Sequence, residues 1–174
     1  MSYLIDANAF ITPYKAYYAF DLVPKFWEFL SEQIEKGNIL LIDKVYEEIA
    51  VNKDKTKPSD DLQKWIETLV AHKKSIKTPE IVSAYQEIIN YINDSGKYSD
   101  SAKRVWFELN HADPWLVATA KAEKHKIITF EVKRGARPKG QGWGRVQIPN
   151  VCEDLEIECL NLFDVLRELG FKAL

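Results

Sequence analysis

Short apolar runs that end at a polar residue alternate with segments of helical periodicity in the first fifty residues. Residues 3–5 and, after Asn38, residues 39–42 are apolar, and each run is followed directly by an aspartate. Residues 24–36 carry apolar side chains at helical spacing and begin at a proline. A second helix over residues 44–51 is expected after Asp43, which closes the strand and could cap that helix. The order strand, helix, strand, helix favours a parallel sheet covered on both faces.

The middle of the chain has helical periodicity and no apolar run typical of a strand. Residues 53–59 are polar and rich in lysine, which is typical of a surface loop. The pattern then predicts three helices with no strand between them, over residues 60–71, 80–93 and 99–109. We expect this helical excursion, about residues 53–110, to pack beside the sheet within one domain that spans residues 1–174.

The last third returns to alternating helices and strands. The pattern predicts a helix that starts at Asp113–Pro114 and runs to 124, a buried strand over 127–130, candidate short strands over 146–148 and 157–160, and a final helix to 169 capped by Asn161. The whole chain is therefore predicted to be an α/β protein, a three-layer α/β/α sandwich around a mainly parallel sheet of four or five strands.

Composition narrows the class of protein. The 46% of hydrophobic residues and five tryptophans favour a packed globule over a disordered chain. No apolar run is long enough to span a membrane, and the first residues do not have the charged-then-apolar design of a signal peptide, so we expect a soluble, cytoplasmic protein. Two cysteines, Cys152 and Cys159, are expected to be free thiols in a reducing compartment.

Charge is uneven along the chain. The net charge of −2 excludes a generically basic nucleic-acid binder, but residues 131–147 contain five cations against one acid, with four glycines among them. This basic glycine-rich segment is either a clamp for backbone phosphates or a solvated turn with scattered charges. Its cations, the candidate RNA-binding residues, are Lys133, Arg134, Arg137, Lys139 and Arg145.

Four acids stand where a fold of this class collects its ligands. Asp6 and Glu131 each end a predicted strand, and the carboxyl ends of parallel strands meet at one edge of a sheet. Glu48 lies beside the apolar face of its predicted helix, and Asp113 lies on the inward face at the start of another. Each acid also has a plain structural reading: a turn for Asp6 and Glu131, an exposed helical charge for Glu48, and a helix cap for Asp113.

If the four carboxylates meet, they repel one another, and a divalent cation relieves that repulsion. Hard oxygen ligands with no histidine or cysteine nearby favour Mg²⁺ or Mn²⁺ over zinc. The histidines do not alter this expectation, because His72 and His125 are expected at the surface and His111 has no second histidine to pair with. Such a metal activates water and stabilises charge at a phosphate under attack.

The acids lie in motifs that resemble those of PIN-domain nucleases, in order and over nearly the whole chain. The matching stretches are Ile5–Asn8, Val45–Ile49, Ala112–Ala120 and Ile128–Glu131. The resemblance implies that Asp6, Glu48, Asp113 and Glu131 are catalytic acids that bind Mg²⁺ or Mn²⁺, that Asn8 supports the first acid and that Thr129 orients the last. Residues 148–161 resemble a branch of PIN-like proteins known as a domain of unknown function.

Two features depart from the family pattern. The last motif usually has an aspartate two residues after the threonine, whereas here a glutamate, Glu131, takes that place, so its reach to the metal is open. The helical stretch over residues 60–109 is longer than in minimal PIN domains and is expected to cover or reshape the groove.

The resemblance implies a metal-dependent endoribonuclease that leaves a 5′-phosphate and a 3′-hydroxyl, similar to the VapC toxins that a partner antitoxin silences. The alternative is a catalytically silent PIN-like module that binds RNA or a protein. A nucleotide-binding α/β domain is disfavoured, because no glycine-rich loop follows the first strand. A homodimer is a further expectation, with Tyr14, Tyr17, Tyr18 and Phe20 either at the contact or packed over the first helix.

Overall fold

The computed structural model describes residues 2–51, 56, 58–136 and 141–172. Its helices and strands, in chain order, are β1 (Tyr3–Ile5), α1 (Asn8–Ala16), α2 (Pro24–Glu35), β2 (Ile39–Ile42), α3 (Asp43–Ala50), α4 (Asp61–Thr68), the 3₁₀ turn η1 (Val70–His72), β3 (Lys73–Lys74), α5 (Pro79–Asp94), α6 (Asp100–Trp106), α7 (Ala112–Glu123), β4 (Lys126–Ile128), α8 (Ile148–Asp154), β5 (Cys159–Leu160) and α9 (Leu162–Glu168).

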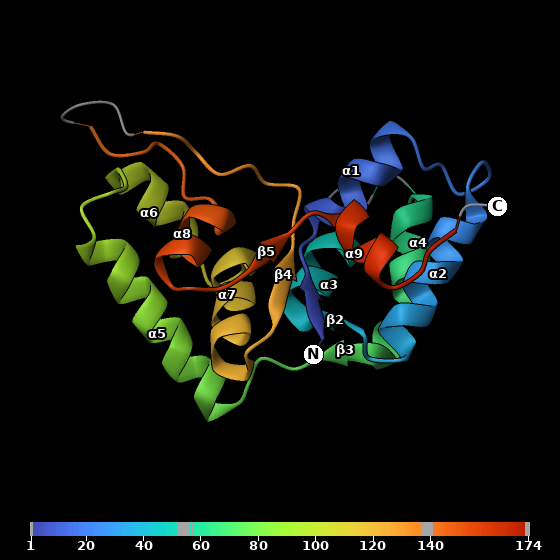
Figure 1. Ribbon diagram of the computed structural model, residues 1–174, viewed down its shortest axis with the longest axis horizontal. Helices are drawn as coiled ribbons and strands as arrows, with labels where there is room; N and C mark the ends of the chain where they lie inside the picture. Colours follow the sequence, from blue (N-terminus) through green and yellow to red (C-terminus); the bar gives the residue numbers. More distant parts are fainter. Residues whose placement is uncertain (1, 52–55, 57, 137–140, 173–174) are drawn as a thin grey trace.

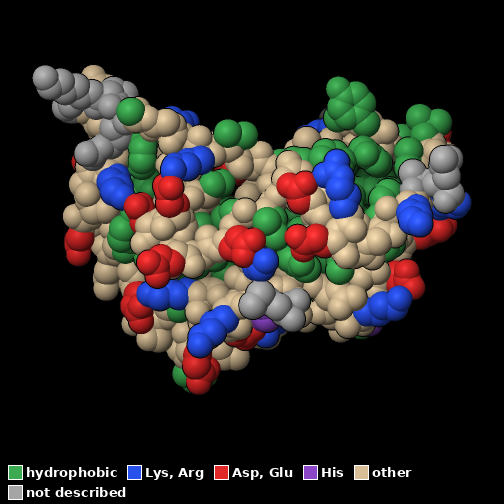
Figure 2. Space-filling model, viewed as in Figure 1, with side chains coloured by type: hydrophobic (Ala, Val, Ile, Leu, Met, Phe, Trp, Pro, Cys, Tyr) green, Lys and Arg blue, Asp and Glu red, His purple; other side chains and the backbone are tan. Residues whose placement is uncertain are grey.

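The strands form one parallel sheet in the order β3-β2-β1-β4-β5, as expected for this class. The first strand lies at the centre, with Leu4 paired to Leu40 on one side and to Ile127 on the other. All carboxyl ends therefore meet at one edge of the sheet, the upper edge in Figure 1. The molecular surface is hollowed above this edge, between the side that carries α6 and α8 and the side that carries α1 (Figure 2).

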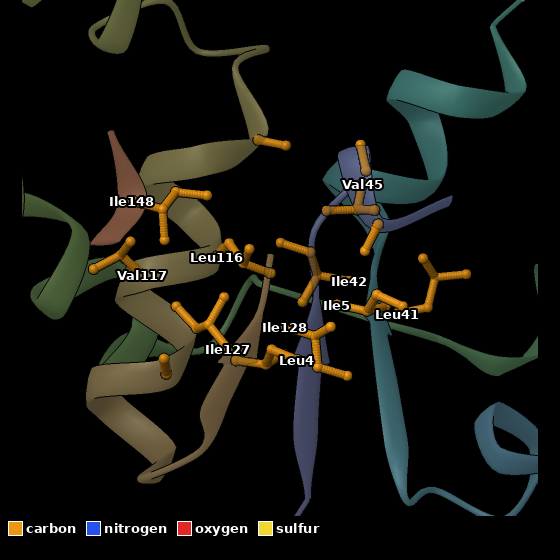
Figure 3. Packing of buried hydrophobic residues seen from close by; sticks show 14 of the residues in the cluster. Leu4, Ile5, Leu41, Ile42, Val45, Leu116, Val117, Ile127, Ile128 and Ile148 are labelled. Carbon is orange, nitrogen blue, oxygen red and sulfur yellow. The ribbon is translucent and has the colours of Figure 1, made fainter. Parts of the chain in front are cut away.

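Helices cover both sides of the sheet, with α5 to α8 on one side in Figure 1 and α1, α2, α4 and α9 on the other. The central strands are apolar at consecutive positions, because they are covered on both faces. Leu4, Ile5, Ile127 and Ile128 have no exposed surface, and Leu116 of α7 packs against them (Figure 3). The long helix α5 packs along α7, so the expected helical excursion lies beside the sheet and supports the helix that carries Asp113.

Several element boundaries differ from the prediction. The middle segment does contain a strand, β3, which is two residues long at the edge of the sheet and too short to leave a pattern. The predicted strand over residues 146–148 is wrong, because Ile148–Pro149 begins α8 and Pro149 suits a first helical turn. Asp43 and Asp113 are not caps: each lies inside the first turn of its helix, and neither helix has a side-chain cap.

The aromatic residues of α1 and the following turn mostly pack inward. The ring of Phe20 stacks on Trp27 at 4.2 Å, and Tyr18 contacts Phe26 at 4.5 Å. Tyr14 lies beside Phe20, whereas Tyr17 is 84% exposed. Packing over the neighbouring helix therefore accounts for three of the four aromatic residues that were candidates for a dimer contact.

Two further expectations concern the thiols and the membrane. Both cysteines are free, with Cys152 buried in α8 and Cys159 partly buried in β5. None of the described helices combines the length and the apolar character needed to cross a bilayer.

Candidate active site

Asp6 lies at the centre of the candidate site, directly after β1. Its backbone N–H donates to the carbonyl oxygen of Ile128 at 3.0 Å, which holds it beside the end of β4. The residue is only 4% exposed, and its Oδ2 accepts a hydrogen bond from the Thr129 hydroxyl at 2.8 Å. A carboxylate is thus held almost out of solvent at the carboxyl edge of the sheet.

A small hydrogen-bond network fixes this carboxylate. The Asn8 side chain accepts from the N–H of Phe130 at 2.9 Å and donates to Thr129 Oγ1 at 3.2 Å. The N–H of Glu131 also donates to Thr129 Oγ1, at 3.0 Å. The threonine hydroxyl therefore has its own proton directed at Asp6, because two other donors occupy its acceptor side.

The charges of three other acids act on Asp6. The pKa of Asp6 is raised to about 8 as the net result of several causes: burial raises it most, the negative charges of Asp113, Glu131 and Glu48 raise it further, and the Thr129 hydrogen bond lowers it. These acids come from α7, the segment after β4, and α3. The fold therefore places the other three predicted acids close enough for their charges to act on the buried carboxylate of Asp6, although Glu48 is exposed on its helix.

Asp113 is paired with His111, a residue for which the sequence predicted no role. Its Oδ2 lies 3.0 Å from His111 Nε2, and their side chains are 14% and 27% exposed. Burial lowers the pKa of His111, but the hydrogen bond to Asp113 and the charges of Asp113, Glu48 and Glu108 raise it more, so the net shift is upward. A histidine that favours its cationic form thus offsets part of the acidic charge.

Glu131 points back toward the chain that follows it. Its Oε2 accepts from the N–H of Ile148 at 2.7 Å, and its Oε1 lies 3.4 Å from the Arg145 guanidinium. Burial raises the pKa of Glu131, the Ile148 N–H lowers it, and Asp113 raises it again. With its side chain 8% exposed, this carboxylate ties the segment after β4 to the start of α8.

The oxygen donors and the surplus negative charge of these acids suit a hard divalent cation. Within the described part of the chain, however, no group of three or more His, Cys, Asp or Glu side chains is arranged to hold a metal ion. His111 engages Asp113, while Ile148 and Arg145 engage Glu131. The residues therefore fit the chemistry of such a cation, and coordination requires carboxylates to leave their present partners.

A cavity of about 290 Å³ opens beside this acidic cluster. Asp113, His111 and Arg145 lie along one part of its lining, and Trp106 of α6 and Val146 are among the apolar residues of the rest. The cavity therefore connects the acids with the helical excursion and with the segment that precedes α8.

The basic residues of the segment after β4 are partly neutralised. Lys133 forms an ion pair with Glu153, and Arg145 is paired with Glu131. Arg134 is exposed, and its backbone is bound by the Asn150 side chain. Arg137 and Lys139 lie outside the described residues.

Sequence reasoning missed His111 and the backbone N–H of Ile148. For His111 a signal was present, because a histidine two residues before an inward-facing aspartate at a helix start can reach that aspartate. No signal was present for Ile148, because a backbone donor carries no side-chain pattern and its position depends on how the preceding segment folds.

Comparison with known proteins gives a family for the chain and a similar fold. A family model described as "Domain of unknown function (DUF4411)" matches residues 3–173. No curated protein matches the chain in sequence. Among solved structures, the chain is similar to a chain of VapBC2 from Rickettsia felis. That VapBC2 was crystallised bound to a DNA fragment from its promoter. The TM-score is 0.56 at 13% sequence identity, over 92% of this chain and 98% of that one. At that identity the similarity shows the fold alone, and it confirms the expected α/β/α sandwich around a parallel sheet.

Proposed function

Because the chain belongs to the DUF4411 family, whose description names no activity, we propose its function from the acidic site: a metal-dependent endoribonuclease that hydrolyses phosphodiester bonds of RNA. The proposal rests on one observation above all. A nearly buried carboxylate, Asp6, lies in the field of three further acids at the carboxyl edge of a parallel sheet, where α/β folds bind their ligands.

This arrangement is costly for the fold and therefore points to a ligand. Charged carboxylates at close range destabilise one another, and the raised pKa of Asp6 expresses that cost. Stability alone would be served better by an apolar or neutral residue at the end of β1. A bound cation offsets the charge, so the observation supports a metal site more than a structural role.

Within the proposal, Asp6 and Asp113 hold Mg²⁺ or Mn²⁺ directly, and Glu48 and Glu131 complete the site or position a water molecule. When bound, such an ion supplies activation of water and stabilisation of negative charge at the phosphate. Thr129 and Asn8 act on Asp6, because their hydrogen bonds fix the direction of its Oδ2. His111 holds Asp113 until the ion binds.

The strand of RNA would approach along the hollow above the sheet edge (Figure 2). Arg134 and Arg145 are exposed cations at this end of the molecule, and Lys133 joins them if Glu153 releases it. Contacts of this kind hold phosphates and carry no sequence information. Arg137 and Lys139 belong to the same proposed set on sequence grounds alone.

The test is cleavage of RNA by the Asp6→Asn and Asp113→Asn variants, made separately and assayed with Mn²⁺. We expect each variant to lose cleavage while remaining folded, because asparagine keeps the size of the side chain and removes its charge. Glu47→Gln is the matched control, since Glu47 lies beside Glu48 on α3 but pairs with Lys44. Cleavage that persists in both aspartate variants would show that the active site lies elsewhere.

A second reading is a PIN-like module without catalysis that binds RNA or a protein. It is favoured by the engagement of Glu131, because one of its carboxylate oxygens accepts from the N–H of Ile148 and the other is paired with Arg145. Titration with Mn²⁺ separates the two readings, because catalysis requires metal binding that depends on Asp6.

A partner protein is part of the proposal. VapBC2, a structure to which this chain is similar in fold, was crystallised bound to promoter DNA. By analogy of fold, we propose that a protein antitoxin restrains this nuclease, and that the chain also forms a homodimer. Co-purification of the chain with the product of an adjacent gene, followed by loss of cleavage in the complex, is the corresponding test.

A further inference from the structure

The cavity beside Asp113 is built by the two parts of the chain that depart from a minimal sheet-and-helix plan. One wall is α6, at the end of the helical excursion, and the other is residues 144–146 of the segment that precedes α8. Figure 1 shows that segment reaching over to α6 before the chain returns to α8. The cavity therefore depends on a contact between elements that are far apart in the sequence.

That contact is specific. The N–H of Trp143 donates to the carbonyl of Lys97 at 2.8 Å, and the N–H of Ser99 donates to the carbonyl of Trp143 at 3.0 Å. Gly142 passes so close to the turn before α6 that an added Cβ would lie 2.6 Å from Ser99 N. Beyond the cavity, Glu131 fixes Ile148 at the start of α8. The wall is thus held at both ends, and the cavity is a defined feature of the fold.

The lining has two kinds of surface. Ala102, Trp106 and Val146 are buried and give an apolar interior, and half-exposed Val105 forms part of the rim. The other part of the lining carries charged and polar groups, including Arg145. A volume of about 290 Å³ lies near the lower end of the roughly 300–1,000 Å³ of small-molecule sites. The lining suits one flat ring system with apolar faces and polar edges.

We propose that this cavity receives the base of the nucleotide next to the scissile phosphate. The inference rests on the proposed function, because Asp113 belongs both to the acidic site and to the cavity lining. A strand whose phosphate lies at the acids places a neighbouring base within reach of the cavity. Only an unstacked base can enter, so the substrate is RNA with an unpaired nucleotide at the cleavage point.

The inference also assigns base preference to particular residues. Apolar surface accepts any base, whereas hydrogen bonds to the edges of the base distinguish one from another. His111 and Arg145 are the polar groups of the lining that can contact those edges. The helical excursion then contributes to substrate selection, because α6 supplies the wall opposite them.

Binding of neutral nucleosides tests the cavity without metal and without phosphate. Adenosine, guanosine, cytidine and uridine are titrated in EDTA and compared with ribose, by two-dimensional NMR of the intact chain. We expect at least one nucleoside to bind and to shift the indole signal of Trp106, assigned with Trp106→Phe, while ribose leaves it unchanged. Equal effects of ribose and nucleosides, or no shift of this signal, would overturn the inference.

A pair of glycine variants locates the binding. Gly144 lines the cavity and Gly135 does not, and an added Cβ meets no atom within 4 Å at either position. Gly144→Leu adds bulk to the cavity wall and is expected to weaken nucleoside binding by at least about tenfold. Gly135→Leu is the matched control and is expected to leave binding unchanged. Equal binding by both variants would place the nucleoside elsewhere.

The proposed nuclease activity and the proposed base site can be refuted independently of each other. Nucleoside binding in EDTA together with absence of RNA cleavage would retain the cavity as a base site and refute the nuclease. RNA cleavage with the same base preference in wild type and Gly144→Leu would retain the nuclease and refute the base site.

Discussion

Replacing Asp6 with asparagine should stabilise the protein when metal is absent. The pKa of Asp6 rises from 3.8 to about 8 on folding, because the carboxylate is buried among other acids. Between these two pH values the folded state holds a proton that the unfolded state has released. The contribution of Asp6 to the free energy of unfolding therefore falls as the pH rises through this range, and it is lowest above pH 8.

The shifted pKa of Asp6 sets an upper limit on the stabilisation expected from Asp6→Asn. Each pKa unit corresponds to about 1.4 kcal/mol, so at pH 7 the penalty is on the order of 4 kcal/mol. Relaxation of the neighbouring acids reduces it, and we expect Asp6→Asn to raise the free energy of unfolding by about 2–4 kcal/mol at pH 7. Asparagine preserves the fold locally, because its side-chain oxygen can accept the Thr129 hydroxyl as Asp6 does.

Urea unfolding measured at several pH values tests this reasoning. Wild type should lose stability from pH 4 to pH 8, and the variant should show a flatter profile over the same range. Asp164→Asn is the control, because Asp164 is exposed on α9 and pairs only across the helix surface with Arg167. A variant less stable than wild type at pH 7, or a pH profile as steep as that of wild type, would refute the account of Asp6.

Three further outcomes follow from the same geometry. Mn²⁺ should raise the melting temperature of wild type and not that of Asp6→Asn, measured by differential scanning fluorimetry. Thr129→Val should cost about 1–3 kcal/mol in urea unfolding, because it leaves the N–H of Glu131 without its acceptor, whereas Thr129→Ser should cost less. Gly142→Ala should lower the melting temperature, because its Cβ would meet Ser99, whereas Gly144→Ala has open space and should leave it unchanged.

The fold was accessible from sequence where one physical constraint dominates. A strand covered on both faces must be apolar at consecutive positions, and Leu4–Ile5 and Ile127–Ile128 satisfy this without ambiguity. The edge strand β3 is Lys73–Lys74, and lysine at an edge carries no apolar pattern. Residues 146–148 were wrongly predicted as a strand, because a short apolar run does not distinguish a strand from the first turn of α8.

The candidate site was likewise predictable from sequence only in part. Acids that follow strands are placed by topology, so the proximity of Asp6 and Glu131 could be predicted, and helical phase placed Asp113 inward. The direction in which each carboxylate points could not be predicted. It depends on partners such as His111 and the N–H of Ile148, which reach the site only after the segments around them have folded.

Glu131 shows why that direction matters for function. One of its oxygens holds the start of α8 and the other lies beside Arg145, a residue of the cavity lining. If Glu131 turns toward a metal, it must release both partners, and Arg145 becomes available to a phosphate. Binding of metal and binding of RNA would then favour each other, because both require the contact between Glu131 and Arg145 to break and whichever binds first breaks it.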